Sequence, residues 1–155
     1  MVVKDRFVNA VLFVDIDGVF HAVDSRDFEY RGDDLVVPDH PDLFQWAPLL
    51  WAIIEQYPVD LVVHSSWRRL YAPEELIARF PVEMQSRIVG VTEGRERHQS
   101  ILNYVCMNDV ERFAVLDDSP EAFPEGWANL IVCDSHRGIN DDEVQAKIRQ
   151  FLSGE

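Results

Sequence analysis

Short apolar runs recur along the chain, and polar or acidic residues follow most of them. A short apolar run without alternation is typical of a parallel strand that is covered on both faces. The runs cover residues 8–14, 59–63, 88–91, 113–116 and 130–132. They predict about five buried strands.

Segments with a helical period lie between and after these runs, at residues 43–56, 73–80, 99–107 and 142–152. Strands that alternate with helices predict an α/β fold with a parallel sheet and right-handed crossovers. Because no repeat, low-complexity tract or linker interrupts the alternation, we expect one domain over residues 1–155.

Residues 20–38 depart from the alternation. Residues 27–30 and 35–37 flank the turn-forming sequence Arg31-Gly32-Asp33-Asp34. This pattern favours a small β-hairpin, with a plain surface loop as the alternative. Since the segment directly follows the first strand end, we expect a flap over a site located there.

The charge of the chain limits its partners. Fourteen Lys and Arg oppose 28 Asp and Glu, which gives a formal net charge of -14. Such a chain is a poor non-specific binder of a phosphate backbone, although a local basic patch stays compatible with it. Residues 1–10 lack the apolar core of a signal peptide, and no apolar run reaches the roughly 20 residues of a membrane span. We therefore expect a cytoplasmic protein without membrane contact.

Polar residues gather where the predicted strands end, and ligands of open parallel sheets bind at that edge. The residues that follow the first, second and fourth strands are Asp15 and Asp17, Ser65 and Ser66, and Asp117 and Asp118. Carboxylates that converge on one crevice repel each other unless a cation lies among them. Hard oxygen ligands suit Mg²⁺, so the sequence predicts a magnesium site.

Asp15 and Asp17 are the candidate reacting groups. Residues two apart in an extended backbone point to the same side, and Gly18 permits a tight turn. One carboxylate can attack phosphorus to form an aspartyl-phosphate, and the second can protonate the leaving oxygen and then activate water. An acidic strand-to-turn transition and a calcium loop are the alternatives.

The serines of the second strand end have two possible uses. Ser65 can donate a hydrogen bond to a phosphoryl oxygen while Ser66 caps the next helix, or Ser65 is itself the cap. Gly18, Ser66 and Arg68 are candidate substrate contacts, with solvated surface as the alternative for Arg68. Capping is also the alternative for the fourth strand end, where Asp118 or Ser119 could cap a helical turn that has Pro120 near its first position.

Arg97 stands at the start of the predicted helix before the fourth strand. A cation at a helix N-terminus is unfavourable because it opposes the macrodipole. Such a local conflict is expected of a residue that serves a functional site. Its guanidinium can offset the carboxylates and hold a phosphate. Arg95 is the second candidate, and a solvated basic turn is the alternative.

Taken together, these segments resemble the phosphatase branch of the haloacid dehalogenase (HAD) superfamily. The matching motifs are Asp15-Ile16-Asp17-Gly18-Val19, Ser65, Arg97 and Asp117-Asp118. Their order agrees with the superfamily pattern, and they span residues 8 to about 133. Arg97 departs from the pattern, which more often has Lys there.

The resemblance implies a Rossmann-like three-layer sandwich and a role for each acidic residue. Asp15 would be the nucleophile and an Mg²⁺ ligand. Asp17 would be the general acid and base, with its backbone carbonyl on the metal. Asp118 would bind the metal directly or through water, and Asp117 would support it.

Neither usual insertion point is long enough for a full cap domain. A capless member implies an exposed nucleophile and a large phosphorylated substrate, such as a nucleic-acid end or a phosphoprotein. The element Ser65-Ser66-Trp67-Arg68 is also similar to HAD domains associated with RNA repair proteins. We therefore expect a magnesium-dependent phosphomonoesterase.

Three rival functions are compatible with parts of the sequence. A catalytically silent HAD-fold binding or regulatory module would usually lack Asp15 or Asp17. A phosphotransferase or phosphomutase would usually need a cap to exclude water. A receiver that accepts phosphate for signalling would lack the second catalytic Asp and the flap.

Overall fold

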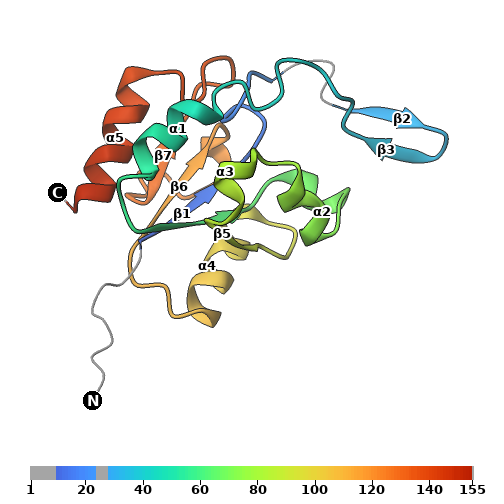
Figure 1. Cartoon of the computed structure of the whole chain (residues 1–155). Helices are drawn as coiled ribbons and strands as arrows, with labels where there is room; N and C mark the ends of the chain where they lie inside the picture. Colours follow the sequence, from blue (N-terminus) through green and yellow to red (C-terminus); the bar gives the residue numbers. More distant parts are fainter. Residues whose placement is uncertain (1–9, 24–27, 155) are drawn as a thin grey trace.

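The computed structural model describes residues 10–23 and 28–154. Its centre is a sheet of five parallel strands in the order β5-β4-β1-β6-β7 (Figure 1). The strands are β1 (Ala10–Val14), β4 (Val59–Val63), β5 (Ile88–Val91), β6 (Phe113–Asp117) and β7 (Leu130–Val132). The predicted parallel α/β sheet is confirmed. Residues 8 and 9 of the first predicted strand lie outside the described residues.

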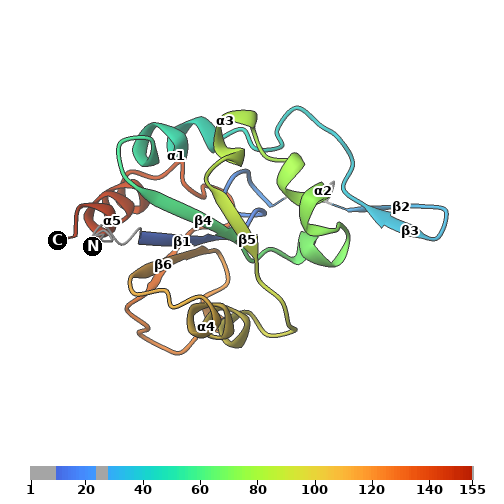
Figure 2. The ribbon, with the colours of Figure 1, turned by 60° about the horizontal axis from the view of Figure 1, so that its bottom comes forward.

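Helices cover both faces of the sheet, which gives the predicted three-layer, Rossmann-like arrangement (Figure 2). The helices are α1 (Ala47–Ile54), α2 (Pro73–Ala78), α3 (Val82–Gln85), α4 (Arg97–Met107) and α5 (Asp142–Ser153), with the 3₁₀ turns η1 (Ser66–Arg69) and η2 (Pro120–Ala122). Figure 2 shows α4 on one face, with α1, α3 and α5 on the other. Successive residues of β1 alternate between the two cores: Leu12 belongs to the larger cluster and Phe13 to the smaller one on the α4 side.

The first helix is shorter than predicted, because α1 begins at Ala47 rather than at residue 43. Phe44 has φ 58°, in the left-handed region, which a continuous α-helix excludes. Pro48 then stands in the first turn, where its missing N–H does no harm.

A two-stranded hairpin of β2 (Glu29–Arg31) and β3 (Asp34–Val36) projects outward from the body of the fold (Figures 1 and 2). Gly32, with φ 67°, forms its two-residue turn together with Asp33. At the end of the hairpin, the Val37 N–H donates to the Tyr71 hydroxyl at 3.1 Å. The predicted hairpin is confirmed from residue 28 onward, and its use as a flap stays a prediction.

The central position of β1 brings three strand ends together. The Asp15 N–H donates to the Leu116 carbonyl at 3.1 Å, and the His64 N–H donates to the Val14 carbonyl at 3.0 Å. Residues that follow β1, β4 and β6 therefore share one edge of the sheet. No helix within residues 10–23 and 28–154 is long and apolar enough to cross a bilayer.

Candidate active site

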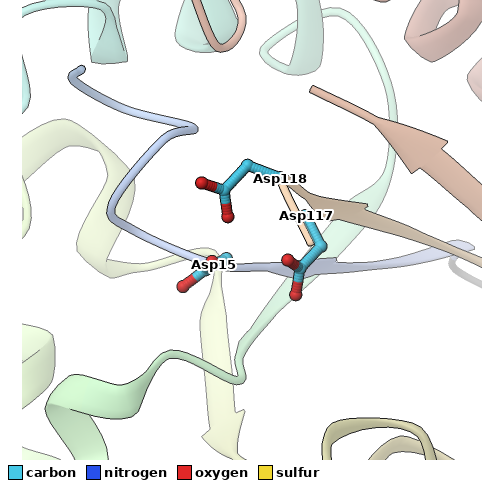
Figure 3. A group of neighbouring side chains, drawn as sticks. All are labelled: Asp15, Asp117 and Asp118. Carbon is cyan, nitrogen blue, oxygen red and sulfur yellow. The ribbon is translucent and has the colours of Figure 1, made fainter. Parts of the chain in front are cut away.

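Three carboxylates meet at the shared edge of β1 and β6. One oxygen from each of Asp15, Asp117 and Asp118 lies within 4.8 Å of the others (Figure 3). Asp15 follows β1, and the other two lie at the end of β6, which pairs directly with β1. The sequence prediction that these residues converge is confirmed by this geometry. Their spacing and oxygen chemistry suit a hard divalent cation.

Arg97, the first residue of α4, supplies positive charge to this cluster. Its Nη1 lies 3.1 Å from Asp15 Oδ2 and 2.7 Å from both carboxylate oxygens of Asp117. Arg95, the second candidate, is exposed, and its backbone carbonyl accepts a hydrogen bond from Arg69 at 3.1 Å. The structure therefore brings Arg97 rather than Arg95 to the carboxylates.

The cluster still holds more negative than positive charge. Burial raises the pKa of Asp15 well above its usual value, and the neighbouring Asp117 raises it further, while Arg97 opposes both effects. Burial likewise raises the pKa of Asp117 to about 6, against the lowering effect of Arg97. Burial works against the charge on Arg97, but Asp15 and Asp117 outweigh it and raise the pKa of the guanidinium. One arginine is insufficient for three acids, so a cation would relieve the repulsion that remains.

Gly18 and Ser135 set the position of Asp118. A Cβ placed on Gly18 would lie 2.2 Å from Asp118 Oδ2, so the absence of a side chain creates the space that the carboxylate occupies. The Ser135 hydroxyl donates to the same oxygen at 2.9 Å. Neither Asp118 nor Ser119 forms a side-chain cap on η2, contrary to the capping alternative. The strand pattern did not predict the contact of Ser135, although this residue follows β7 closely and so obeys the same strand-end rule.

Asp17 makes contacts separate from this cluster. Its carboxylate accepts a hydrogen bond from Trp67 Nε1 at 2.9 Å and lies 2.8 Å from His21 Nε2. β1 ends at Val14, so the alternation that predicts a common direction for Asp15 and Asp17 does not govern the turn that follows. The predicted metal contact of Asp17 through its backbone carbonyl stays a prediction.

One of the two serines that follow β4 caps the 3₁₀ turn η1. Ser65, rather than Ser66, is the N-cap of η1, since its Oγ accepts a hydrogen bond from the Trp67 N–H at 3.1 Å. Ser66 is the first residue of the 3₁₀ turn. The Ser65 hydroxyl keeps its own proton for donation, because an accepting hydroxyl can donate at the same time. The proposed phosphate contact of Ser65 is therefore compatible with capping.

Arg68 follows β4, and residues that follow the neighbouring strand β5 hold its side chain in place. Its guanidinium donates to the Thr92 hydroxyl and, at 2.6 Å, to the Gly94 carbonyl. Together with Arg69, these residues line a hollow beside the ends of β4 and β5. The contacts orient Arg68 and leave further N–H groups on its fork.

The expectation of an exposed nucleophile is wrong in this structure. Asp15 is only 2% exposed. Its Oδ1 accepts a hydrogen bond from the Ile16 N–H at 2.8 Å, and Arg97 binds the other oxygen. Residues 10–23 and 28–154 contain no cap domain, yet the carboxylate is buried within the α/β fold itself.

His64 is buried beside the cluster, with its Nδ1 3.6 Å from Asp117 Oδ2. Its ring is 1% exposed, and Nε2 lies 3.3 Å from the Leu116 carbonyl. Burial, assisted by the charge of Arg97, lowers the pKa of His64 to about 3. The imidazole is therefore neutral at physiological pH and adds no charge to the site.

Comparison with protein families identifies the chain. The family model described as the HAD domain in Swiss Army Knife RNA repair proteins matches residues 11–144. The chain belongs to this family. The matched range of this HAD domain contains the three carboxylates, Arg97, and Asp17 with its partners. Family membership supports HAD-type hydrolase chemistry at the level of the superfamily. No curated protein and no solved structure matched the chain.

Proposed function

We propose that this HAD domain is a magnesium-dependent phosphomonoesterase that acts through an aspartyl-phosphate on Asp15. The observation that carries the proposal is the meeting of Asp15, Asp117 and Asp118 within 4.8 Å, with Arg97 bound to two of them. A nucleophile, a cation site and a counter-charge for phosphate thus lie at one strand edge.

The donor set fits Mg²⁺. Three carboxylate oxygens from Asp15, Asp117 and Asp118 exceed the one or two that Mg²⁺ usually takes. Arg97 contacts both oxygens of Asp117 but only one oxygen of Asp15, so Asp117 is the supporting member. Asp15 and Asp118 would be the side-chain ligands. Bound Mg²⁺ would neutralise charge on these carboxylates and on the phosphate oxygens.

The proposed reaction has two displacements. An Asp15 carboxylate oxygen attacks phosphorus, the bond from phosphorus to the ester oxygen breaks, and Asp17 gives that oxygen a proton. Asp17 then takes a proton from water as the water oxygen attacks phosphorus, which releases phosphate and restores Asp15. Arg97 and the Ser65 hydroxyl stabilise the transferring group; further N–H groups of Arg97 are suited to it because both carboxylate contacts use Nη1 alone.

The proposed substrate is a phosphorylated RNA or DNA end. The family description refers to RNA repair, and Arg68 and Arg69 line the hollow beside the site. With Glu93 also in this lining, the two arginines leave a small local excess of positive charge on a chain whose net charge is -14. We therefore expect recognition of a few phosphates near the end rather than non-specific binding along a strand.

The test is a phosphate-release assay with matched substrates. Oligonucleotides with a 3′- or 5′-phosphate are compared with mononucleotides, phosphopeptides and a generic aryl phosphate, with and without Mg²⁺. We expect turnover that needs Mg²⁺, is highest on an oligonucleotide end, and is lost in Asp15→Asn. Higher turnover of phosphopeptides would overturn the substrate assignment. Inactivity on every class with Mg²⁺ present would instead favour a silent binding module.

A further inference from the structure

Buried side chains bind both oxygens of the Asp17 carboxylate. Trp67 Nε1 donates to Oδ2 at 2.9 Å, and His21 Nε2 lies 2.8 Å from Oδ1. Both rings are fully buried, while the Asp17 side chain keeps 15% exposure. Rotation of the carboxylate would leave two buried N–H groups without this acceptor, which is costly.

The direction of the His21 contact follows from its other nitrogen. The Phe44 N–H donates to His21 Nδ1 at 3.2 Å. A backbone N–H can only donate, so Nδ1 accepts and the ring proton resides on Nε2. The imidazole therefore donates to Asp17.

Phe44 adopts an uncommon conformation where it makes this contact. Its φ of 58° is unfavourable for a bulky residue and persists only when the surroundings enforce it. Its ring packs against Phe80, with centroids 4.9 Å apart, and against Trp67 at 5.8 Å. Packing of the Phe44 ring thus holds the backbone N–H that orients His21. The same ring also contacts Trp67, the second donor to Asp17.

We propose that Trp67 and His21 are positioning residues that hold the Asp17 carboxyl group for proton transfer. This inference rests on the proposed function, because it concerns the residue that protonates the leaving oxygen. Neither ring bonds to Asp15, Asp117 or Arg97 in the described contacts, whose hydrogen bonds form a separate set. Loss of either donor should therefore impair proton transfer more than phosphate binding.

The test varies the leaving group. Trp67→Phe keeps an aromatic ring and removes the N–H. A poor leaving group needs a proton more than an acidic phenol does. For Trp67→Phe we expect kcat/KM to fall about tenfold on phenyl phosphate and less than about threefold on 4-nitrophenyl phosphate. The inhibition constant for inorganic phosphate should change little between wild type and Trp67→Phe.

Two controls separate positioning from general damage. Trp51→Phe makes the same substitution in α1, where the Trp51 ring packs against the guanidinium of Arg87. Arg87 donates to the carbonyls of Tyr57 and Val59, so this tryptophan lies at the end of β4 opposite to the site. Trp51→Phe should leave both kcat/KM values unchanged. In an Asp17→Asn background, Trp67→Phe should add no further loss, because coupled residues are not additive.

A second variant pair guards against misfolding of Trp67→Phe. His21→Gln keeps an N–H near the position of Nε2, whereas His21→Leu has none. We expect His21→Gln to restore most of the leaving-group selectivity that His21→Leu loses. Equal behaviour of the two variants would overturn the role of His21.

A separate readout reports the hydrogen bond without turnover. The indole N–H signal of Trp67 in a ¹H–¹⁵N spectrum, assigned by its loss in Trp67→Phe, should move in Asp17→Asn while the other indole signals stay. Wild-type turnover with equal losses on both aryl phosphates in Trp67→Phe would overturn this inference alone. Absence of wild-type turnover would overturn the proposed function and the inference with it.

Discussion

The Asp118 carboxylate occupies the space in which a side chain on Gly18 would stand. An ideal Cβ on Gly18 lies 2.2 Å from Asp118 Oδ2 and 2.5 Å from its carboxyl carbon. The backbone of Gly18 also has φ 77°, which L residues rarely adopt. The glycine of the first motif therefore shapes the acidic site through a contact with the last motif.

Gly18→Ala should displace Asp118 and weaken the cation site. We expect apparent Mg²⁺ affinity to fall about tenfold or more, as for other losses of ligand orientation. The measurement is the Mg²⁺ dependence of turnover together with a thermal melt. Gly126→Ala is the matched control, because Gly126 has φ 71° with open space around its Cβ position. Both variants should lose about 1 to 2 kcal/mol of stability to backbone strain. Equal Mg²⁺ dependence in the two variants would show that the contact with Asp118 is unimportant.

Arg97→Ala should be destabilising, because it leaves two buried carboxylates without their cation. Breaking a buried ion pair costs about 3–5 kcal/mol. The side chain of Arg97 is 26% exposed, so we expect a smaller loss of about 2 kcal/mol in urea unfolding of the metal-free protein. The exposed Arg95 provides the control, and Arg95→Ala should lie within about 0.5 kcal/mol of wild type. The reverse order would contradict the assignment of Arg97.

Acidic pH should compete with Mg²⁺ for the cluster. Burial raises the pKa of Asp117 from its ordinary 3.8 to about 6. Between these values the folded metal-free protein binds more protons than the unfolded chain, so this group makes stability fall as pH rises from about 4 to about 6. Deprotonated Asp117 adds negative charge beside Asp15 and Asp118, the proposed ligands, so Mg²⁺ affinity should rise over the same window. Calorimetric titration with Mg²⁺ at pH 5 and pH 7.5 measures this, and Asp117→Asn should reduce the difference.

Asp15→Asn should separate stability from activity. The raised pKa of Asp15 shows that its charge is unfavourable in the metal-free fold. A neutral isostere should therefore stabilise the metal-free protein at pH 7.5 by about 1 kcal/mol, while turnover falls at least about a thousandfold. Thermal melts with and without Mg²⁺ test this, since added Mg²⁺ should stabilise wild type more than the variant. A variant less stable than wild type without metal would show that the Arg97 contact outweighs the repulsion.

The strands and the convergence of acids were predictable because they follow from local pattern and one topological rule. The runs at residues 59–63 and 130–132 agree with β4 and β7 to the residue. The late start of α1 was not predictable, because the left-handed backbone of Phe44 is imposed by packing against Phe20 and Phe80.

The hydrogen bond between Asp17 and Trp67 was also not predictable, because it joins residues that are distant along the chain. Trp67 is 50 residues away along the chain, and no periodicity reveals a hydrogen bond between side chains so far apart. The capping role of Ser65 was also ambiguous, since Ser65 and Ser66 are chemically identical candidates and only the start of η1 distinguishes them.

The pairing of β1 with β6 has a consequence for how the molecule forms. Asp15 and Asp117 lie about 100 residues apart along the chain, and they meet only when these two strands pair. Closing a loop of that length is slow compared with forming a helix or a hairpin. The cation site is thus a late-assembling feature of the nascent chain. A polypeptide released before residue 118 is made has all the residues of the first motif but cannot complete the cluster.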